Sequence, residues 1–375
     1  MKIGIDARFM SRKNLAGIGL FVKKIIEYFN NIDDENEYYL YTNKQYLHID
    51  ELNLSKKFHL RIIPSKVGTL SVLFKWHKEI TKDGLDIFWG TEQILPRSVK
   101  ETKYVLTIHD LAIIKNPKWG KWDNVIIQNM LVRGSSKRAH KIFAMSENTK
   151  KDIIKILKCD PNKITVTYCP LLNFNKEKIC SDDINTVLKR YRISSNYFLF
   201  IGTIEPRKNV DTLIKAFNNF CVDYDDIDLV IVGKLGWKPK RVLTELDKSP
   251  FKDRIVRPGY ITEKEKNCLL KGCLAFVFPS HYEGFGSPLL EAMANETLII
   301  SAKNSSLPEV AGNAAIYVED ENNFNHLARA LKTVATMPPN IRKVYVDNGK
   351  DRVDFFSIEK TIGKMYTEII YLYGI

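Results

Sequence analysis

The sequence predicts an α/β protein of two domains, each a doubly wound parallel sheet covered by helices on both faces. First, a chain of 375 residues is too long for one hydrophobic core. Second, strand-like apolar runs alternate with helical patterns along most of the chain, which favours parallel sheets. Third, the apolar periodicity fades between residues 171 and 196, where polar residues accumulate. We therefore expect a linker there, between an N-terminal domain of residues 1–175 and a C-terminal domain of residues 176–357.

Short apolar runs rich in β-branched or aromatic residues are predicted to be buried strands. In the first domain they are Lys2–Ala7, Tyr38–Tyr41, Leu60–Ile63, Asp86–Trp89, Tyr104–Ile108, Lys141–Met145 and Ile164–Tyr168. In the second domain they are Tyr197–Ile201, Asp228–Val232, Arg254–Pro258, Leu274–Phe278 and Leu298–Ser301. Helices are predicted, among other places, at Leu20–Phe29, Ser71–Thr81, Lys121–Arg138, Glu147–Leu157 and Ile358–Tyr373.

The composition is that of an ordinary globular protein, with 45% apolar and 27% charged residues. No run of 18 apolar residues is present, so no membrane-spanning helix is expected. The N-terminal segment has the pattern of a strand followed by charge, not that of a signal peptide. The six cysteines lack CxxC or zinc-site spacing, which indicates free thiols in a reducing compartment. We therefore expect a cytoplasmic protein.

Positive charge is concentrated in the first half of the chain. The formal net charge is +13, and residues 1–190 hold 33 Lys and Arg against 21 Asp and Glu. This excess favours an anionic partner, although a solvated basic surface would account for it as well. No nucleic-acid reading motif is present, so nucleic acid is not the expected partner. Basic and aromatic residues mix in segments 71–82 and 115–122, which suits a peripheral contact with an anionic membrane surface. An internal amphipathic helix is the alternative for segment 71–82, and it accounts for this segment slightly better.

The strongest functional signal lies in residues 275–302, which predict a strand, a loop and a helix. The loop carries the carboxylate of Glu283 and two glycines, and the helix carries that of Glu291. A loop of this kind lies past the carboxyl end of a parallel strand, where ligands bind. Glycines let a ligand approach the backbone closely. The sequence therefore predicts a binding site here.

The start of this helix is predicted to offer backbone donors to an anion. Ser287 is expected to be the N-cap, and Pro288, which lacks an N–H group, suits the first helical position. The free amides would then be those of Leu289 and Leu290.

Three other polar motifs follow predicted strands or open helices. Gly17 and Gly19 open a helix, where they are either a flexible turn or a place for phosphate to approach the backbone. His109 follows the strand Tyr104–Ile108, where it is either a hydrogen-bonding group of a cleft or a core histidine. Arg207 and Lys208 stand at a predicted helix start, where the helix dipole disfavours cations. An anion nearby would offset that cost.

Together, these features indicate a diphosphate held by two cations and backbone amides. The chain contains no Walker A motif, no HExxH motif and no Asp-rich cluster, so no metal is expected. Cations of the protein can themselves stabilise a leaving group.

These motifs resemble those of retaining GT-B glycosyltransferases of glycosyltransferase family 4, the group 1 glycosyl transferases. The segments that carry the resemblance are GIDARFM with AGIGLFV, IHDL, AMSENTKKDI, GTIEPRKN, IVGKLGW, FVFPSHYEGFGSPLLEAMA and SSLPEVAGNAA. The resemblance implies two Rossmann-like domains that face each other across a cleft. The N-terminal domain would bind the acceptor and the C-terminal domain a nucleotide-sugar donor, and helix 358–375 would pack back on the N-terminal domain.

The resemblance also implies roles for single residues. Glu291 would bind the ribose hydroxyls of the donor, and Glu283 would face the donor sugar. The remaining expected donor contacts are the diphosphate-binding Arg207, Lys208, Gly17 and Gly19, and the backbone of Phe285 and Gly286. His109 would hydrogen-bond the sugar near the reacting carbon, so Glu283 and His109 are the expected catalytic residues. Segments 233–237 and 260–261 would line the base pocket.

The opening motif is most similar to enzymes that add mannose in surface polysaccharide synthesis, so the implied reaction moves mannose from GDP-mannose to a glycan or lipid-linked saccharide. A UDP-hexose donor is the alternative. A non-catalytic glycan-binding or nucleic-acid-binding protein is the rival from another class. Leu20 and Phe21 replace the frequent Arg-Tyr pair of the family, which puts a transfer of acceptor specificity in doubt.

Overall fold

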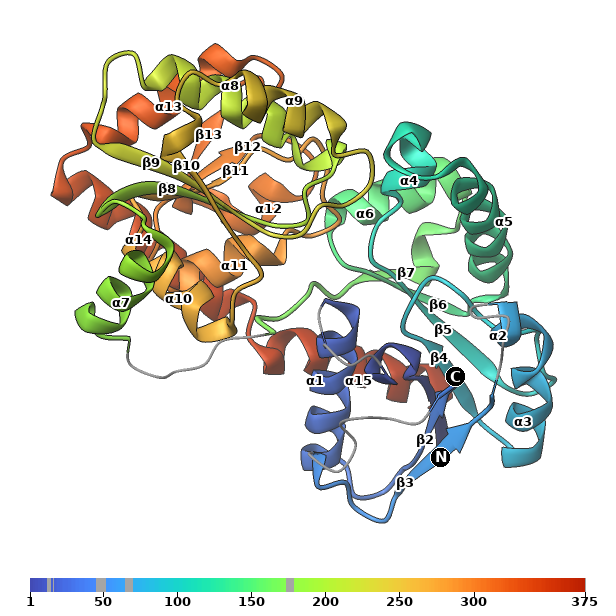
Figure 1. Cartoon of the computed structure of the whole chain (residues 1–375). Helices are drawn as coiled ribbons and strands as arrows, with labels where there is room; N and C mark the ends of the chain where they lie inside the picture. Colours follow the sequence, from blue (N-terminus) through green and yellow to red (C-terminus); the bar gives the residue numbers. More distant parts are fainter. Residues whose placement is uncertain (12–14, 16, 45–51, 65–69, 173–178, 375) are drawn as a thin grey trace. The chain divides into compact units, whose positions relative to one another are not determined.

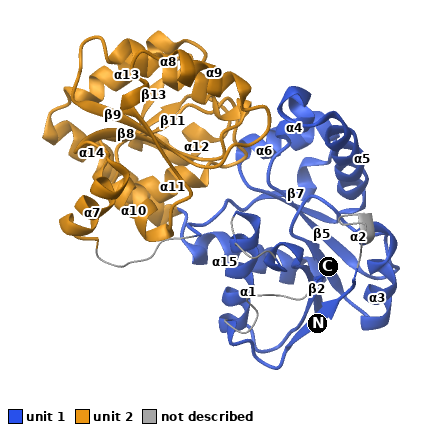
Figure 2. Ribbon diagram, in the orientation of Figure 1, with its two compact units in different colours: residues 1–173, 356–375 blue, residues 174–355 orange. Residues whose placement is uncertain are grey.

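The computed structural model of this chain describes residues 1–11, 15, 17–44, 52–64, 70–172 and 179–374. The chain divides into two compact units (Figure 2). Unit 1 comprises residues 1–173 and 356–375, and unit 2 comprises residues 174–355. Each unit is built around its own parallel sheet, with helices on both faces of the sheet (Figure 1).

The strands of unit 1 lie in the order β3-β2-β1-β4-β5-β6-β7, and all neighbours are parallel. They are β1 (Lys2–Asp6), β2 (Glu37–Thr42), β3 (Phe58–Ile62), β4 (Ile87–Gly90), β5 (Lys103–Ile108), β6 (Lys141–Ala144) and β7 (Ile164–Val166). The helices are α1 (Ile18–Ile32), α2 (Leu70–Phe74), α3 (Trp76–Asp83), α4 (Ala112–Lys115), α5 (Trp122–Arg138), α6 (Glu147–Asp152) and α15 (Ile358–Gly374). The strand order reverses between β1 and β4.

Aromatic side chains fill much of the core of unit 1. The ring of Phe88 on β4 packs edge-to-face against Tyr41 and Trp76, with centroids 5.5 and 6.0 Å apart. All three side chains are fully buried. Trp89 points to the other face of β4 and donates its Nε1 hydrogen to Thr107 Oγ1 at 2.9 Å, so its one polar group is satisfied.

The last helix, α15, belongs to unit 1 although the chain reaches it from unit 2. Ile362, Met365 and Ile369 form its buried stripe. Polar groups fasten the same helix: Lys364 Nζ donates to the Val166 carbonyl at 2.9 Å, and Lys141 pairs with Glu368 at 2.6 Å. The helix is therefore an integral layer of unit 1.

The strands of unit 2 lie in the order β10-β9-β8-β11-β12-β13, again all parallel. They are β8 (Asn196–Ile201), β9 (Ile227–Val232), β10 (Ile255–Gly259), β11 (Ala275–Phe278), β12 (Ile299–Ala302) and β13 (Ala315–Val318). The helices are α7 (Ser181–Tyr191), α8 (Val210–Phe220), α9 (Lys240–Lys248), α10 (Glu263–Gly272), α11 (Ser287–Ala294), α12 (Leu307–Ala311), α13 (Phe324–Ala335) and α14 (Pro339–Phe355). Here the order reverses between β8 and β11, at the two central strands.

Two helix-rich regions differ from the sequence-based expectation. The polar stretch 171–196 was expected to be a linker, but it contains α7, because Val187 and Leu188 form a buried face that its polar majority conceals. Residues 173–178 of that stretch lie outside the described residues. The helix expected at Ser71–Thr81 is two helices separated at Lys75.

This second difference bears on the membrane-binding hypothesis for segment 71–82. Trp76, one of its aromatic side chains, is fully buried and packs against Tyr41 and Phe88. For Trp76, the alternative of an internal helix is therefore correct. This side chain belongs to the core of unit 1 and does not contact a membrane. Among the described helices, none combines the length and the apolar character needed to cross a membrane.

We expect the substitution Ile369→Ala in α15 to lower the free energy of unfolding of unit 1 by roughly 2–5 kcal/mol, because it removes fully buried methylene and methyl groups. Chemical denaturation followed by circular dichroism measures this change. Tyr371→Ala is the matched control, since Tyr371 lies on the same helix and is 66% exposed; its effect should stay within about 0.5 kcal/mol. Equal effects of the two substitutions would contradict the packing described for α15.

Candidate functional site in unit 2

The candidate site lies at the carboxyl ends of β8 and β11, where the strand order of unit 2 reverses. At such a reversal the loops after the two neighbouring strands diverge to opposite faces of the sheet and leave a crevice. The loop after β8 brings Arg207 and Lys208, and the loop after β11 brings Glu283. The topology thus brings together side chains that are 75 and 76 residues apart in sequence.

The loop after β8 is held in place by an asparagine. Pro206–Lys208 form a single 3₁₀ turn, and Asn209 follows in the left-handed region with φ of 58°, a conformation that Asn tolerates well. The buried Asn209 side chain donates to the carbonyl of Pro279 at 3.1 Å and to that of Glu321 at 2.6 Å. This asparagine ties the cationic turn to the end of β11.

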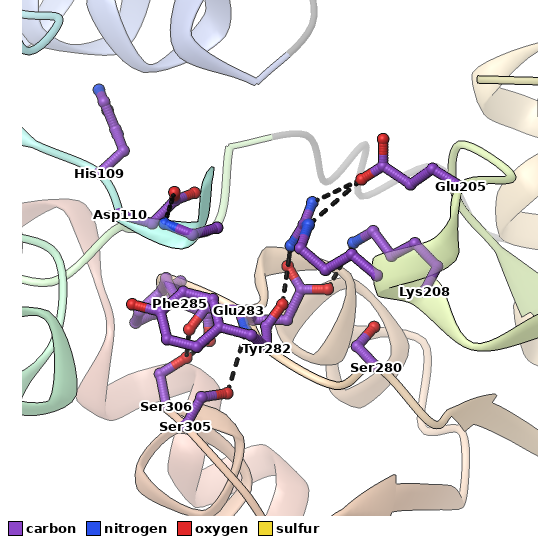
Figure 3. Close-up of polar contacts among 12 residues, drawn as sticks. His109, Asp110, Glu205, Lys208, Ser280, Tyr282, Glu283, Phe285, Ser305 and Ser306 are labelled. Atoms are coloured by element: carbon purple, nitrogen blue, oxygen red, sulfur yellow. Dashed lines mark hydrogen bonds and ion pairs between the residues drawn. The ribbon is translucent and has the colours of Figure 1, made fainter. Parts of the chain in front are cut away.

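The loop after β11 is fixed through its backbone by two serines. The Glu283 amide donates to Ser305 Oγ at 3.0 Å, and the single hydroxyl hydrogen of Ser306 is shared between the carbonyls of Glu283 and Phe285, which lie 3.0 and 2.8 Å from Oγ (Figure 3). Gly286 then takes a φ of 98°, and a Cβ there would lie 2.9 Å from Leu307 Cδ2, so glycine is required. The position of the Glu283 backbone is therefore set before any ligand binds.

The Glu283 carboxylate lies between the two cations of the other loop. Lys208 Nζ is 2.5 Å from one carboxylate oxygen (Figure 3). A terminal nitrogen of Arg207 is 2.8 Å from the other. Arg207 also pairs with Glu205 at 3.0 Å and donates to the Tyr282 carbonyl at 2.8 Å. The anion expected from the cations at this position is thus supplied by the chain itself.

The environment keeps Glu283 ionised. Burial raises the pKa of a carboxyl group, but here the combined attraction of Lys208 and Arg207 outweighs burial and lowers the pKa of Glu283 from 4.5 to about 2. Lys208 is also buried, and its Nζ lies 4.8 Å from the centroid of the Phe278 ring, which adds a cation–π contact. The cluster is therefore charged and screened from water.

Glu291 on α11 has a different electrostatic environment. Burial raises its pKa above the usual 4.5, and Lys266 on α10, 2.8 Å away, opposes this only in part. Lys266 also pairs with Glu263 at 2.7 Å, so its positive charge is shared between two carboxylates. The two carboxylates of the EGFGSPLLE motif therefore have pKa values shifted in opposite directions.

The structure corrects two expectations about the start of α11. The N-cap is Gly286, and Ser287 is already the first helical residue, because the left-handed conformation of the glycine sets the entry of the chain. The Leu289 amide, expected to be a donor for an anion, instead donates to the Gly286 carbonyl at 2.9 Å. The side chains of Leu289 and Leu290 are fully buried. Leu290 and the backbone of Phe285 stay predictions as donor contacts.

His109 lies in unit 1, after β5. Its Nε2 is 2.8 Å from the Thr91 carbonyl, which can only accept, so Nε2 carries a hydrogen. Burial lowers the pKa of His109, more than the Thr91 contact and Asp110 raise it. The neutral ring therefore presents Nδ1 as an acceptor.

Gly17 and Gly19 also lie in unit 1, and the structure gives a different reason for glycine at each position. Gly17 precedes α1 with a φ of 48° and is exposed, with no heavy atom near the place of a Cβ. Gly19 is buried, and a Cβ there would lie 3.0 Å from the Phe9 carbonyl oxygen. Packing within unit 1 alone thus explains Gly19, whereas the conformation of Gly17 is that of a sharp turn.

Some residues of the site were not anticipated from the sequence. Glu205, Ser305 and Ser306 lie within motifs that carried the resemblance, so those motifs were the available signal. Lys266 had no such signal, because it is one of three lysines on α10 and only the fold places it beside Glu291. Among the described residues, no group of three or more His, Cys, Asp or Glu side chains is arranged to hold a metal ion.

Comparisons with known proteins agree with this fold. Residues 188–352 match the model of the family described as glycosyl transferases group 1. O-antigen chain mannosyltransferase B of Escherichia coli is 28% identical over 260 residues, which cover 66% of this chain and 65% of the relative. O-antigen chain mannosyltransferase RfbU of Salmonella typhimurium is 29% identical over 268 residues, which cover 70% and 69%. The crystal structure of HepE from Anabaena with UDP-glucose has a TM-score of 0.76 over 99% of both chains, at 15% identity.

Two doubly wound units with this structural likeness define the GT-B class of folds, as the sequence motifs predicted. Residues 188–352, nearly all of unit 2, form a domain of the glycosyl transferases group 1 family. The aligned region spans 65% of the length of the E. coli relative, slightly less than two thirds.

We expect Glu283→Gln to lower the free energy of unfolding of unit 2 by roughly 3–5 kcal/mol at neutral pH, because it leaves the buried Lys208 without its carboxylate and removes one of the two carboxylates that pair with Arg207. The folded-state pKa of Glu283 lies below its unfolded value, so its contribution is fully present above about pH 4.5 and is lost as the pH falls towards 2. The gap between wild type and variant should therefore close over that interval. Urea titrations at a series of pH values measure it.

Glu319→Gln, on an exposed side chain of the same unit, is the control and should leave stability nearly unchanged at every pH. A gap between wild type and Glu283→Gln that stays constant down to pH 2 would show that the ion pairs do not set the charge of Glu283.

Proposed function

We propose that this chain is a retaining glycosyltransferase that moves a hexose from a nucleotide-sugar donor to a glycan or lipid-linked saccharide in the synthesis of a cell-surface polysaccharide. The proposed donor is GDP-mannose. Support for mannose comes from the two relatives named as O-antigen chain mannosyltransferases. Support for a nucleotide-sugar donor comes from the structure of HepE, which was solved with UDP-glucose, and this makes a UDP-hexose the alternative donor.

The observation that carries this proposal is the buried cluster of Glu283 with Arg207 and Lys208 at the strand-order reversal of unit 2. An ion pair that only stabilises the fold could lie anywhere in the unit. This one lies at the carboxyl ends of the strands, where ligands of parallel sheets bind. Arginine and lysine suit phosphate oxygens, the first through its forked donors and the second as a point charge. A diphosphate bound here would share Arg207 and Lys208 with Glu283.

The proposed reaction breaks the bond between the sugar C1 and the diphosphate oxygen through an oxocarbenium-like state. Negative charge grows on the leaving diphosphate, where Arg207 and Lys208 stabilise it. The acceptor oxygen bonds to C1 on the face that the diphosphate leaves, and its proton passes to the leaving phosphate. Every bond broken is matched by one formed, and no other reactant is required. Glu283, ionised beside the sugar, stabilises the positive charge at C1.

The other predicted donor contacts fit the same proposal. Glu291 would accept hydrogen bonds from the ribose hydroxyls, with Lys266 as the residue that positions it. The exposed ring of Tyr260 and the neighbouring segment 233–237 would receive the base. The contributions of Gly17, Gly19 and His109, which lie in unit 1, stay as predicted from the sequence.

A panel of nucleotide sugars tests the proposal most directly. We would measure thermal shift and isothermal titration with GDP-mannose, UDP-glucose, UDP-galactose and the free nucleotides. The GDP compounds should bind more tightly than the UDP compounds. Preference for a UDP-hexose would select the alternative donor. A folded protein that binds none of these compounds would overturn the enzyme proposal and favour a non-catalytic glycan-binding or nucleic-acid-binding protein.

We also propose that the protein works in the cytoplasm at the inner face of the cytoplasmic membrane, where lipid-linked acceptors are found. The described cysteines are thiols and not disulfides, which suits a reducing compartment. The basic excess of residues 1–190 suits an anionic surface.

We expect Glu283→Ala to lower kcat by at least about 10²–10³-fold, because it removes the charge that faces the developing cation. Donor affinity should fall far less, since Arg207 and Lys208 remain for the diphosphate. Steady-state kinetics and donor titration separate the two effects, with Glu283→Gln as a second variant of closer shape and circular dichroism as the check on folding. A kcat near that of the wild type in both variants would remove Glu283 from the mechanism.

We expect Glu291→Gln to weaken donor binding about 10–100-fold, the effect of losing a charged hydrogen-bond acceptor for the ribose. The matched control is Glu263→Gln, which removes the other partner of the same lysine from a side chain that is 61% exposed. Titration of the donor into each variant measures the change. If both substitutions weaken binding equally, the ribose contact assigned to Glu291 is wrong.

A further inference from the structure

One edge of the sheet of unit 2 is open to a further strand. β13 is the last strand in the order of this sheet, and no strand formed by the described residues pairs with its outer side. The backbone of an edge strand presents N–H and C=O groups that no neighbouring strand satisfies. Proline and charged residues, which commonly prevent pairing at sheet edges, are absent from its sequence AIYV.

A groove with a volume of about 270 Å³ runs between this edge and helix α13. Residues 316–319 of the strand end form one wall of the groove. The other wall consists of His326, Arg329, Ala330 and Thr333 of α13. These helix positions are three or four residues apart in succession along one side of the helix. We call this feature the β13–α13 groove.

The shape of the β13–α13 groove suits an extended chain. A strand of four residues is about 13 Å long, so the open edge can align with four or five residues of another chain. A groove between a strand edge and a helix offers backbone groups on one side and side chains on the other. Its volume is below the roughly 300–1,000 Å³ that is usual for small-molecule pockets. A peptide therefore fits it better than a compact ligand.

The walls of the groove carry polar groups that the fold leaves unsatisfied. Arg329 is exposed, and no carboxylate of the described residues forms a salt bridge with it. Glu319 is exposed at the end of β13, and it likewise has no cation among the described residues. Nδ1 of His326 is buried and has no hydrogen-bond partner in the described part of the chain. A bound segment that carries both signs of charge would complement these walls.

We propose that the β13–α13 groove binds an extended segment of a partner protein, which adds to the six-stranded sheet of unit 2 as a further strand. Main-chain hydrogen bonds to β13 supply affinity, and alternate side chains of the segment face α13 and supply specificity. An acidic side chain of the segment pairs with Arg329, and a basic one with Glu319.

The charges at the end of the groove favour a peptide over other polymers. Glu319, Asp320 and Glu321 follow β13 directly. Three adjacent carboxylates repel a nucleic acid or an anionic lipid surface, whereas they tolerate a peptide with a basic side chain. Binding of such a segment requires neither donor nor acceptor, so the inference does not depend on the proposed function.

Selection from a library of displayed nine-residue peptides on the immobilised full chain tests the proposal. The peptides recovered should share a pattern of alternating apolar residues with an acidic residue among them. A selected peptide, synthesised with a fluorescent label, is then titrated with the full chain and its Kd is measured by fluorescence polarisation. Failure of any sequence to become enriched over repeated rounds would overturn the proposal.

Two variants on exposed side chains of α13 locate the binding site of the selected peptide. Thr333→Trp fills the groove and should weaken binding at least about tenfold, whereas Asn325→Trp, on an exposed residue of the same helix that does not line the groove, should not. Arg329→Gln should weaken binding about fivefold, and its control Lys271→Gln, on exposed α10, should not. Equal affinities of the wild type and both groove variants would place the peptide elsewhere and overturn the proposal.

Backbone methylation of the peptide shows whether it binds as a strand. Successive N–H groups of a strand point to opposite sides, so only every second one can reach β13. Peptides methylated at one backbone nitrogen each should therefore bind at least about tenfold more weakly at every second position of the central residues, and nearly normally between them. Losses without this alternation would contradict strand addition.

The oligomeric state and donor binding separate this proposal from its alternatives. If light scattering shows a wild-type dimer that Thr333→Trp converts to a monomer, a second copy covers the groove and the proposal is wrong. Thr333→Trp and Arg329→Gln should keep the circular dichroism spectrum and the donor affinity of the wild type. A wild-type chain that binds the peptide but no nucleotide sugar would support this inference and count against the proposed function alone.

Discussion

The ion-pair cluster of Glu283, Arg207 and Lys208 is the interaction on which the candidate site depends. Its members come from two loops that only the strand-order reversal between β8 and β11 brings together. Burial strengthens their attraction and at the same time makes each of them costly without the others. Asn209 and the serines at 305 and 306 fix the two backbones, so that the side chains alone remain to respond to a ligand. Any anion that enters has to compete with a carboxylate already in place.

The two carboxylates of the EGFGSPLLE motif differ because of the cations around them. Glu283 faces the buried Lys208 and the half-buried Arg207, whereas Glu291 shares one lysine with the more exposed Glu263. Burial acts on both in the same direction, so the number of cations decides the sign of each pKa shift. Glu283 is kept strongly ionised, while Glu291 is a half-buried acceptor whose negative charge is less well balanced. Two chemically different carboxylates are thus separated by only seven residues of sequence.

The sequence predicted the strands well, because most of them are short runs of apolar residues. All twelve proposed strands are present within one or two residues, because buried parallel strands are continuous apolar runs. The edge strand β13, Ala315–Val318, was missed because an apolar run of four residues is too short to distinguish a strand from a buried helical segment. Helix α7 was taken for linker because most of its surface is polar.

Prediction of the site stopped at contacts that depend on tertiary placement. The position of Arg207 and Lys208 at a helix start indicated that an anion lies nearby. It did not indicate that this anion is the carboxylate of Glu283. Helix-start chemistry indicated a free Leu289 amide, but the left-handed Gly286 directs its own carbonyl to that donor. Lys266 could be found only from the packing of α10 beside α11.

The position of α15 makes unit 2 an insertion within unit 1. The chain completes residues 174–355 before it reaches the helix that finishes the first unit. During synthesis, unit 1 therefore begins to form first and is completed last, and a growing chain that stops before residue 356 carries a complete second unit beside an open sheet face on the first. Until α15 arrives, the surface that it covers with Ile362, Met365 and Ile369 remains exposed to water.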